Sequence, residues 1–135
     1  MKLFYFVSLF LLFNNFTYAS YINWKWDYEK ALLLAKKENK NLMIFLRKEN
    51  CDKCKKMLQT TLINQNYIDK INDKYISVIV TYEDKNDYPI EMFYTLEFPS
   101  LFFVNSKDES FLTEPISGFI SSKNFTNLYP SILSK

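Results

Sequence analysis

The two cysteines, Cys51 and Cys54, limit how this chain can be held in a fold. They are the only cysteines in 135 residues, and only two residues separate them. A disulfide that closes so short a loop removes little freedom from the unfolded chain, so it adds little stability. The fold must therefore rest on a hydrophobic core. The pair itself can be a redox pair, half of a zinc site or an incidental feature.

The N-terminus has the pattern of a secretory signal peptide. Lys2 precedes an apolar run at residues 3–13, and polar or small residues follow as far as Ala19. The run is shorter than the roughly 20 residues that a membrane-spanning helix needs, and an uncleaved signal anchor is the alternative. We expect cleavage after Ala19, which leaves residues 20–135 as one exported domain. Export predicts an oxidising compartment, most simply the bacterial periplasm.

Composition argues against several classes of function. The chain has 17 basic and 15 acidic residues, a net charge of +2, and no long run of like charge, so we expect no nucleic-acid partner. It has no histidine, so mechanisms that need an imidazole base or ligand are excluded. A zinc site needs about four ligands, and two cysteines do not supply them. Haem attachment needs a histidine where Lys55 stands. We expect neither a metal nor an organic cofactor.

Hydrophobic periodicity predicts alternating helices and strands. Trp24, Tyr28, Ala31 and Leu32 recur at helical spacing, and Asp27 is a plausible helix N-cap. Further helices are expected after Cys51, within residues 64–72, near residues 90–94 with Asp87 as cap, and from Ser121 or Ser122 onward through Phe125 and Leu128. Strands are expected at residues 42–46, 75–81, 101–104 and 110–113. This order predicts an α/β fold, a mixed β-sheet with helices on both faces.

The predicted helix that follows residues 42–46 places the two cysteines differently. Cys51 would stand at its N-terminal tip and Cys54 on its inward face. Free backbone N–H groups and the helix dipole stabilise a thiolate at such a tip. Three nearby lysines add positive charge, and Asp52 opposes them. Cys51 is therefore the expected nucleophile, and Cys54 the resolving thiol that attacks the Cys51 sulfur and releases a reduced partner.

In these features the sequence resembles the thioredoxin superfamily. The resemblance rests on the strand at residues 42–46, the C-x-x-C-K motif at residues 51–55, and Phe98-Pro99 before the strand at residues 101–104. In that family a cis-proline begins the strand that faces the redox pair, and Pro99 occupies this position. The resemblance implies a thioredoxin fold.

Further positions extend the resemblance over residues 24–133. Gly118 matches the family's glycine before the last helix, and Phe125 and Leu128 match core positions of that helix. The closest resemblance is to exported thioredoxin-like proteins and to the C-terminal domain of the thiol:disulfide interchange protein.

Three positions depart from the family pattern. Asn50 stands where a tryptophan usually precedes the first cysteine, and Phe45 where many members bury an acidic residue. Gln59 replaces a proline that kinks the following helix. These changes are compatible with the fold, but they favour a specialised oxidoreductase over a general reductant.

The resemblance implies an exported thiol:disulfide oxidoreductase that exchanges disulfides with protein substrates. Cys51 would be the nucleophile and Cys54 the resolving thiol, and Phe98 and Pro99 would bind substrate. Phe98, with Phe93 and Tyr94, lines either a peptide-binding surface or the core. The expected partners are protein thiols and disulfides, including a membrane or periplasmic redox partner, and the expected state is a monomer. The alternative is a non-catalytic thioredoxin-fold module that holds one dedicated partner protein near Pro99.

Overall fold

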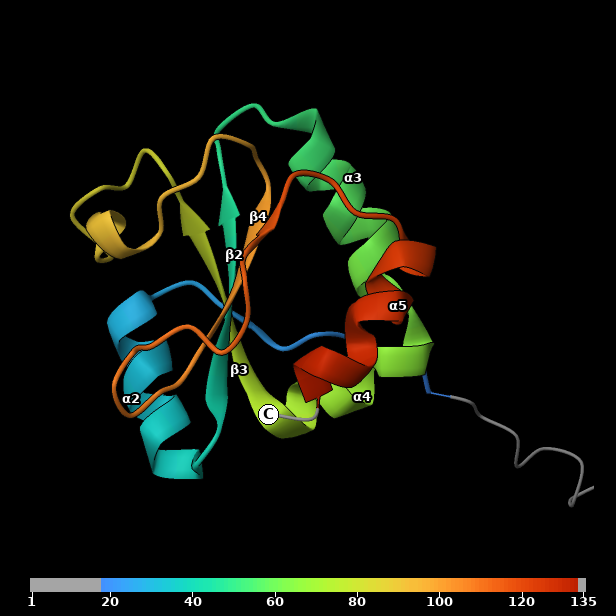
Figure 1. Ribbon diagram of the computed structural model, residues 1–135, viewed down its shortest axis with the longest axis horizontal. Helices are drawn as coiled ribbons and strands as arrows, with labels where there is room; N and C mark the ends of the chain where they lie inside the picture. The colour runs from blue at the N-terminus through green and yellow to red at the C-terminus, as the bar shows by residue number, and fades with distance from the viewer. Residues whose placement is uncertain (1–17, 134–135) are drawn as a thin grey trace, which may run out of the picture.

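A computed structural model describes residues 18–133 as a five-stranded sheet in the order β1-β3-β2-β4-β5, covered by helices (Figure 1). The elements are β1 (Trp24–Lys25), α2 (Tyr28–Glu38), β2 (Asn41–Arg47), α3 (Asp52–Thr60), η2 (Thr61–Ile63), α4 (Gln65–Lys74), β3 (Tyr75–Thr81), η3 (Ile90–Met92), β4 (Ser100–Val104), β5 (Ile116–Ser117) and α5 (Ser122–Leu133). Most of the expected signal peptide, residues 1–17, lies outside the described part of the chain. None of the described helices is long and apolar enough to cross a membrane.

The sheet is mixed, as the sequence predicts. β2 pairs in parallel with β3 and antiparallel with β4, and β1 adds a parallel edge to β3. In the antiparallel pair Leu46 lies opposite Ser100, so the chain leaves β2 and enters β4 at the same end of the sheet (Figure 1). This end carries both the loop to Cys51 and the Phe98–Pro99 bond.

The central strand β2 is buried on both faces. Met43 and Phe45 pack with side chains of α3, α4 and α5, whereas Leu42, Ile44 and Leu46 pack with α2 and the chain that follows β3. All five side chains are fully buried. The alternation of side chains along a strand thus builds one core on each face of the sheet, and the predicted α/β architecture is confirmed.

Helix α2 begins after Asp27, as the sequence predicts. The Asp27 side chain accepts a hydrogen bond from the Lys30 N–H at 3.0 Å, and Asn39 ends the helix with a left-handed φ of 54°. Trp24 was wrongly assigned to the same helical pattern. It lies in β1, opposite Ser77 of β3. Its ring still points into the core, where it meets the Phe45 ring edge-on at 5.9 Å, because an edge strand can bury an apolar side chain as a helix can.

The helix expected to follow Asp87 does not form. Residues 82–99 contain only the single 3₁₀ turn η3, with Pro89 before it. Tyr88 and Phe93 are both buried in the core on the α2 side. Residues five apart on an α-helix point about 140° away from each other, so a helix could not bury both rings in one cluster.

The strand expected at residues 110–113 is reduced to a single bridge between Val104 and Phe111. The strand that pairs with β4 is β5, opposite Ser100 and Leu101. Pro115 has no N–H to donate, so pairing cannot run continuously from Phe111 into β5.

The helices on the other face differ from expectation in detail. α4 is longer than the short helix predicted within residues 64–72, and α3 ends before Leu62, which lies in η2. α5 begins after Ser121 as predicted, and Phe125 is buried with Ile132. Leu128, expected in the core, is 39% exposed because α5 contacts the domain along a narrow stripe.

Candidate redox site

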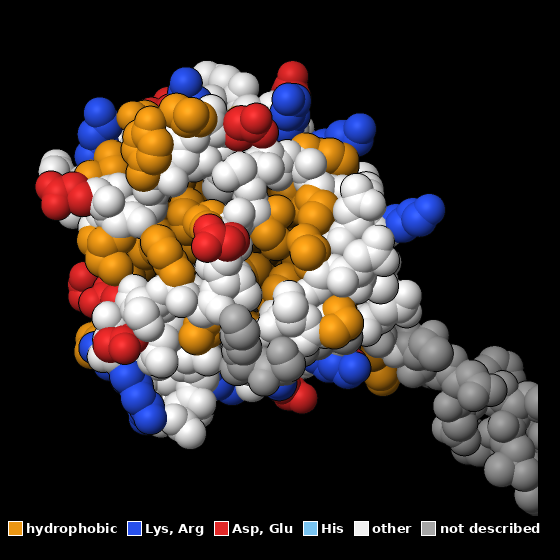
Figure 2. All heavy atoms as spheres, viewed as in Figure 1, with side chains coloured by type: hydrophobic (Ala, Val, Ile, Leu, Met, Phe, Trp, Pro, Cys, Tyr) orange, Lys and Arg blue, Asp and Glu red, His pale blue; other side chains and the backbone are white. Residues whose placement is uncertain are grey.

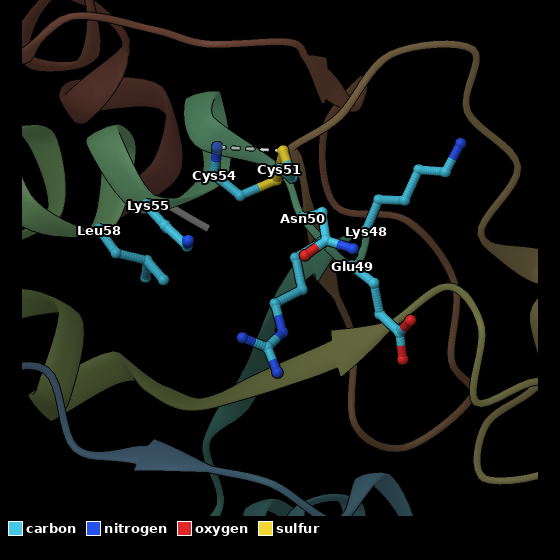
Figure 3. Close-up of a pocket in the computed structure, with 8 residues that line it drawn as sticks. Lys48, Glu49, Asn50, Cys51, Cys54, Lys55 and Leu58 are labelled. Atoms are coloured by element: carbon cyan, nitrogen blue, oxygen red, sulfur yellow. Dashed lines mark hydrogen bonds between the residues drawn. A yellow bond between two sulfur atoms is a disulfide. The ribbon is translucent and has the colours of Figure 1, made fainter.

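The two cysteines form a disulfide at the N-terminus of α3 (Figure 3). Cys51 is the N-cap residue of this helix, and its Sγ accepts a hydrogen bond from the Cys54 N–H at 3.1 Å. Cys51 is half-buried, whereas Cys54 is 2% exposed and belongs to the core. The helix tip therefore leaves one cysteine partly exposed and buries the other, as the sequence predicts.

Residues 47–50 form the loop that carries the chain from β2 to the disulfide. Arg47 is fixed by a hydrogen bond from its Nε to Thr81 Oγ1 at 3.0 Å, and its guanidinium lies 5.5 Å from the ring centre of Trp26. Asn50, directly before the first cysteine, has a φ of 52°. Asparagine adopts this left-handed conformation more readily than most residues.

A hollow of about 240 Å³ lies beside the disulfide, and we call it the cysteine hollow. It is lined by Arg47, Lys48, Glu49, Asn50, Cys51, Cys54, Lys55 and Leu58. Apart from the two cysteines, Leu58 is its one apolar lining residue, and its charged groups are three cations and one carboxylate. Neither of the two salt bridges between described residues uses any of these charges.

Pro99 stands at the end of the sheet that also carries the cysteines. The Phe98–Pro99 peptide bond is cis, as the family resemblance implies. Pro99 directly precedes Ser100, which pairs with Leu46, the second-last residue of β2. The Pro99 carbonyl accepts a hydrogen bond from the Gly118 N–H at 2.8 Å, and Gly118 has a φ of 80°. This hydrogen bond thus joins the segment that leads into α5 to Pro99.

Phe98 lines a second depression, of about 370 Å³, which we call the aromatic hollow. It is lined by Lys48, Tyr82, Ile90, Glu91, Phe93, Tyr94, Thr95 and Phe98. Phe98 is half-buried and meets Tyr82 edge-on at 5.3 Å. Of the other two aromatic residues considered from the sequence, Phe93 belongs to the core and Tyr94 is 76% exposed.

The interior beneath the disulfide is apolar. Phe45 is fully buried, and its neighbours across the sheet are Ile79 and Leu101. No carboxylate occupies this position, as the sequence indicates. Within residues 18–133 there is also no group of three or more cysteine, aspartate or glutamate side chains that could hold a metal ion.

Sequence reasoning missed several residues around the cysteines. Lys48, Glu49 and Leu58 line the cysteine hollow, and Tyr82 lines the aromatic hollow. Lys48 and Glu49 had a signal, since they lie between a buried strand and the first cysteine. Tyr82 had no such signal in the sequence. It comes near this site only because β2 and β3 pair in parallel, so that both strands end at the same edge of the sheet.

Solved structures with the same architecture include several thioredoxin-fold proteins. A thioredoxin from Thermus thermophilus matches 84% of this chain and 88% of its own, with a TM-score of 0.70 and 16% identity. The DsbH oxidoreductase matches 86% of this chain and 87% of its own, with a TM-score of 0.63 and 21% identity. The reduced C-terminal domain of Neisseria meningitidis DsbD matches 76% and 90%, with a TM-score of 0.59 and 24% identity. At these identities the likeness establishes the fold.

No curated protein matches the sequence significantly. The family model described as thioredoxin-like matches residues 23–106, which include β1 to β4, both cysteines and Pro99. A thioredoxin-like fold with a closely spaced Cys-x-x-Cys pair indicates thiol–disulfide oxidoreductase chemistry in general. Since the model matches more than half of its length, the chain belongs to the thioredoxin-like family.

Proposed function

We propose that this protein is an exported thiol:disulfide oxidoreductase that exchanges disulfides with protein substrates through Cys51 and Cys54. The observation that carries the proposal is the unequal exposure of the two cysteine residues at one helix tip. Cys51 caps α3 and is half-buried, whereas Cys54 is 2% exposed. A partner can reach the first sulfur and not the second, which is what a nucleophile and a resolving thiol require.

The reaction proceeds in two exchanges. In the reduced protein the Cys51 thiolate attacks one sulfur of a substrate disulfide, a mixed disulfide forms, and the other substrate sulfur leaves as a thiolate. Cys54 then attacks the Cys51 sulfur, the Cys51–Cys54 disulfide forms, and the second substrate sulfur leaves. Two electrons pass from the protein to the substrate. The reverse sequence oxidises a substrate dithiol.

The second step requires Cys54 to lose its proton. Phe45 is fully buried beneath the pair and offers no base. The cysteine hollow reaches Cys54 and opens to the surface, so we propose that water in this hollow takes the proton.

Phe98 and Pro99 are proposed to bind the substrate chain. Both directly precede β4, beside the end of β2 that leads to Cys51. Phe98 also packs against the cores on both faces of the sheet, so it is held at a fixed position.

We also propose that the protein is exported and has a redox partner. The pattern of the N-terminal residues supports export, most simply to a bacterial periplasm. There the monomeric protein would exchange electrons with a membrane or periplasmic redox partner.

The test is disulfide exchange by single-cysteine variants. Cys51→Ser should abolish exchange with a model protein disulfide, because the accessible nucleophile is lost. Cys54→Ser should instead accumulate a mixed disulfide on Cys51, which mass spectrometry identifies together with the native partner. The double variant is the control for non-specific thiol capture. Exchange that continues undiminished in Cys51→Ser would overturn the proposal.

The alternative is a non-catalytic binding module. It is suggested by Asn50 and the buried Phe45, which stand where the family often has a tryptophan and an acidic residue. Alkylation of the reduced protein across pH separates the two functions. A catalytic Cys51 should react as a thiolate below pH 8, whereas an inert cysteine reacts with a midpoint near pH 8.5.

A further inference from the structure

The segment between β3 and β4 exposes large apolar side chains next to the candidate redox site. Met92, Tyr94 and Leu96 are 36%, 76% and 83% exposed. Figure 2 shows hydrophobic side chains gathered at the upper left, where Figure 1 places this segment. Contiguous exposed apolar surface of this kind is typical of a contact site for another molecule.

The aromatic hollow gives this surface a shaped recess. Five of the eight side chains that line its volume of about 370 Å³ are apolar, and the other three are Lys48, Glu91 and Thr95. Three of the apolar walls are held by ring contacts, Phe98 and Tyr82 against each other at 5.3 Å and Phe93 against Phe102 at 5.2 Å. The recess is therefore preformed and suited to an apolar side chain.

The cysteine hollow has the opposite character. Arg47, Lys48 and Lys55 face a single carboxylate there, that of Glu49. This surface complements negative charge but gives no apolar anchor. A substrate that reaches Cys51 must gain its apolar contacts elsewhere, and the adjoining recess is the aromatic hollow.

Lys48 joins the two hollows. It lines both of them, and its Nζ lies 5.9 Å from the ring centre of Phe98. Figure 3 shows its side chain extending away from the disulfide, on the side opposite Lys55 and Leu58. An extended segment that runs from the disulfide to the aromatic hollow therefore passes this ammonium group.

We propose that the aromatic hollow binds a large apolar side chain of the protein substrate, a few residues from its reactive cysteine, with an acidic residue of the same segment beside Lys48. This inference rests on the proposed function and names its substrate class. Partial burial of a phenylalanine side chain should raise the rate of exchange about ten-fold, which corresponds to ~1.4 kcal/mol.

The test uses synthetic peptides with one cysteine, each activated as a mixed disulfide with thionitrobenzoate. The Cys51 thiolate attacks the peptide sulfur, and the coloured thionitrobenzoate anion leaves. Each peptide has phenylalanine at one position two to five residues from the cysteine, on either side, and serine elsewhere. An all-serine peptide is the reference, and each rate is divided by that protein variant's rate with the symmetric disulfide of thionitrobenzoate.

At least one phenylalanine peptide should react about ten-fold faster than the serine peptide. Tyr94→Ala should remove most of this preference, whereas Tyr21→Ala should keep it, because Tyr21 is 70% exposed like Tyr94 but does not line the hollow. Glutamate between cysteine and phenylalanine should react faster than glutamine, and Lys48→Gln should remove this difference.

Other outcomes overturn the inference. Equal rates for all peptides would do so, as would equal loss of preference in Tyr94→Ala and Tyr21→Ala. A dimer that Tyr94→Ala converts to monomer would assign the patch to a second copy of the chain. If Cys51→Ser still releases thionitrobenzoate at the normal rate, the proposed function itself fails. Normal release that depends on Cys51, without a peptide preference, contradicts only the substrate class.

Discussion

Asn50 departs from the family pattern, and its backbone conformation gives the reason. Its φ of 52° lies in the left-handed region, where most L-residues are strained by roughly 1 kcal/mol and asparagine less so. The loop that enters α3 therefore suits asparagine better than a bulky ring. Asn50 also lines the cysteine hollow.

Ser77, in the middle of β3, leaves a polar atom unpaired in the core. It is 2% exposed, and among the described residues its hydroxyl has no hydrogen-bond partner. An unpaired buried hydroxyl costs about 1–3 kcal/mol. We predict that Ser77→Ala leaves the free energy of unfolding unchanged or raises it by about 1 kcal/mol, measured by urea denaturation.

Ser100 is the matched control for this prediction. It is 1% exposed, but its Oγ lies 2.7 Å from the Glu97 carbonyl oxygen and 2.7 Å from Thr95 Oγ1. Ser100→Ala should therefore lower the free energy of unfolding by roughly 1–2 kcal/mol. Equal losses in the two variants would show that the Ser77 hydroxyl is bonded in solution.

At the scale of single elements, α2 depends on its two caps. Asp27 satisfies the Lys30 N–H, and Asn39 ends the helix in the left-handed conformation while its N–H donates to the last turn. We predict that Asp27→Ala lowers the free energy of unfolding by about 1 kcal/mol. Asn39→Gly should raise it by a few tenths of a kcal/mol, because glycine adopts this conformation without strain.

Thermal and urea denaturation of both α2 variants provide the measurement. Glu29→Ala, in the first turn of the same helix but outside the cap, is the control and should change stability by less than about 0.5 kcal/mol. A loss of stability in Asn39→Gly would contradict the left-handed cap.

The segment between β3 and β4 shows how tertiary contacts override a helical pattern. Its spacing predicts a helix after Asp87, yet burial of both Tyr88 and Phe93 in one core leaves only the 3₁₀ turn η3. The irregular path leaves Tyr94 exposed beside Phe98 and so creates the aromatic hollow.

At the scale of the whole molecule, buried tyrosine hydroxyls link one element to another. The Tyr75 hydroxyl, from the start of β3, donates to the Ile132 carbonyl oxygen in α5, and the Tyr67 hydroxyl, from α4, donates to the Thr61 carbonyl oxygen. Burial raises the pKa of Tyr75 to about 12. Burial, followed by the hydrogen bond to Glu109, raises the pKa of Tyr28 as well.

These shifts predict that the disulfide form loses stability in alkali. Below pH 10 Tyr75 is neutral in the folded and unfolded states, so its contribution is fully present. Between pH 10 and about 12 it ionises only on unfolding. The free energy of unfolding should therefore fall by ~1.4 kcal/mol per pH unit for each such tyrosine, and the contribution is lost above the folded-state pKa.

Urea denaturation of Tyr75→Phe between pH 9 and 11.5 tests this linkage. The variant should be less stable at pH 9, since it lacks the hydroxyl that donates to the Ile132 carbonyl oxygen of α5. Its free energy of unfolding should, however, fall less steeply as the pH rises. Tyr21→Phe is the control, because this 70% exposed side chain is solvated before and after unfolding. An unchanged slope in Tyr75→Phe would contradict the prediction.

Several features could be predicted from the sequence because they depend on neighbouring residues. Apolar runs at residues 42–46, 75–81 and 101–104 predicted the three central strands, and the spacing after Cys51 predicted a helix with Cys54 facing inward. Local capping chemistry predicted the start of α2 and of α5. The cis bond at Pro99, by contrast, followed from the family resemblance and not from the residues alone.

Tertiary structure decided what depends on partners far apart in the chain. β1 and β5 are two residues each, too short to show a period, and they exist because β3 and β4 offer free edges. The same packing placed Trp24 in a strand and Leu128 at the surface, and brought Lys48 and Tyr82 to the rim of one hollow. The sequence alone determined the cysteine pair and its helix, since backbone N–H groups and side-chain periodicity act within a few residues. The surface around that pair was decided by the fold, because burial in a shared core depends on where the whole chain runs.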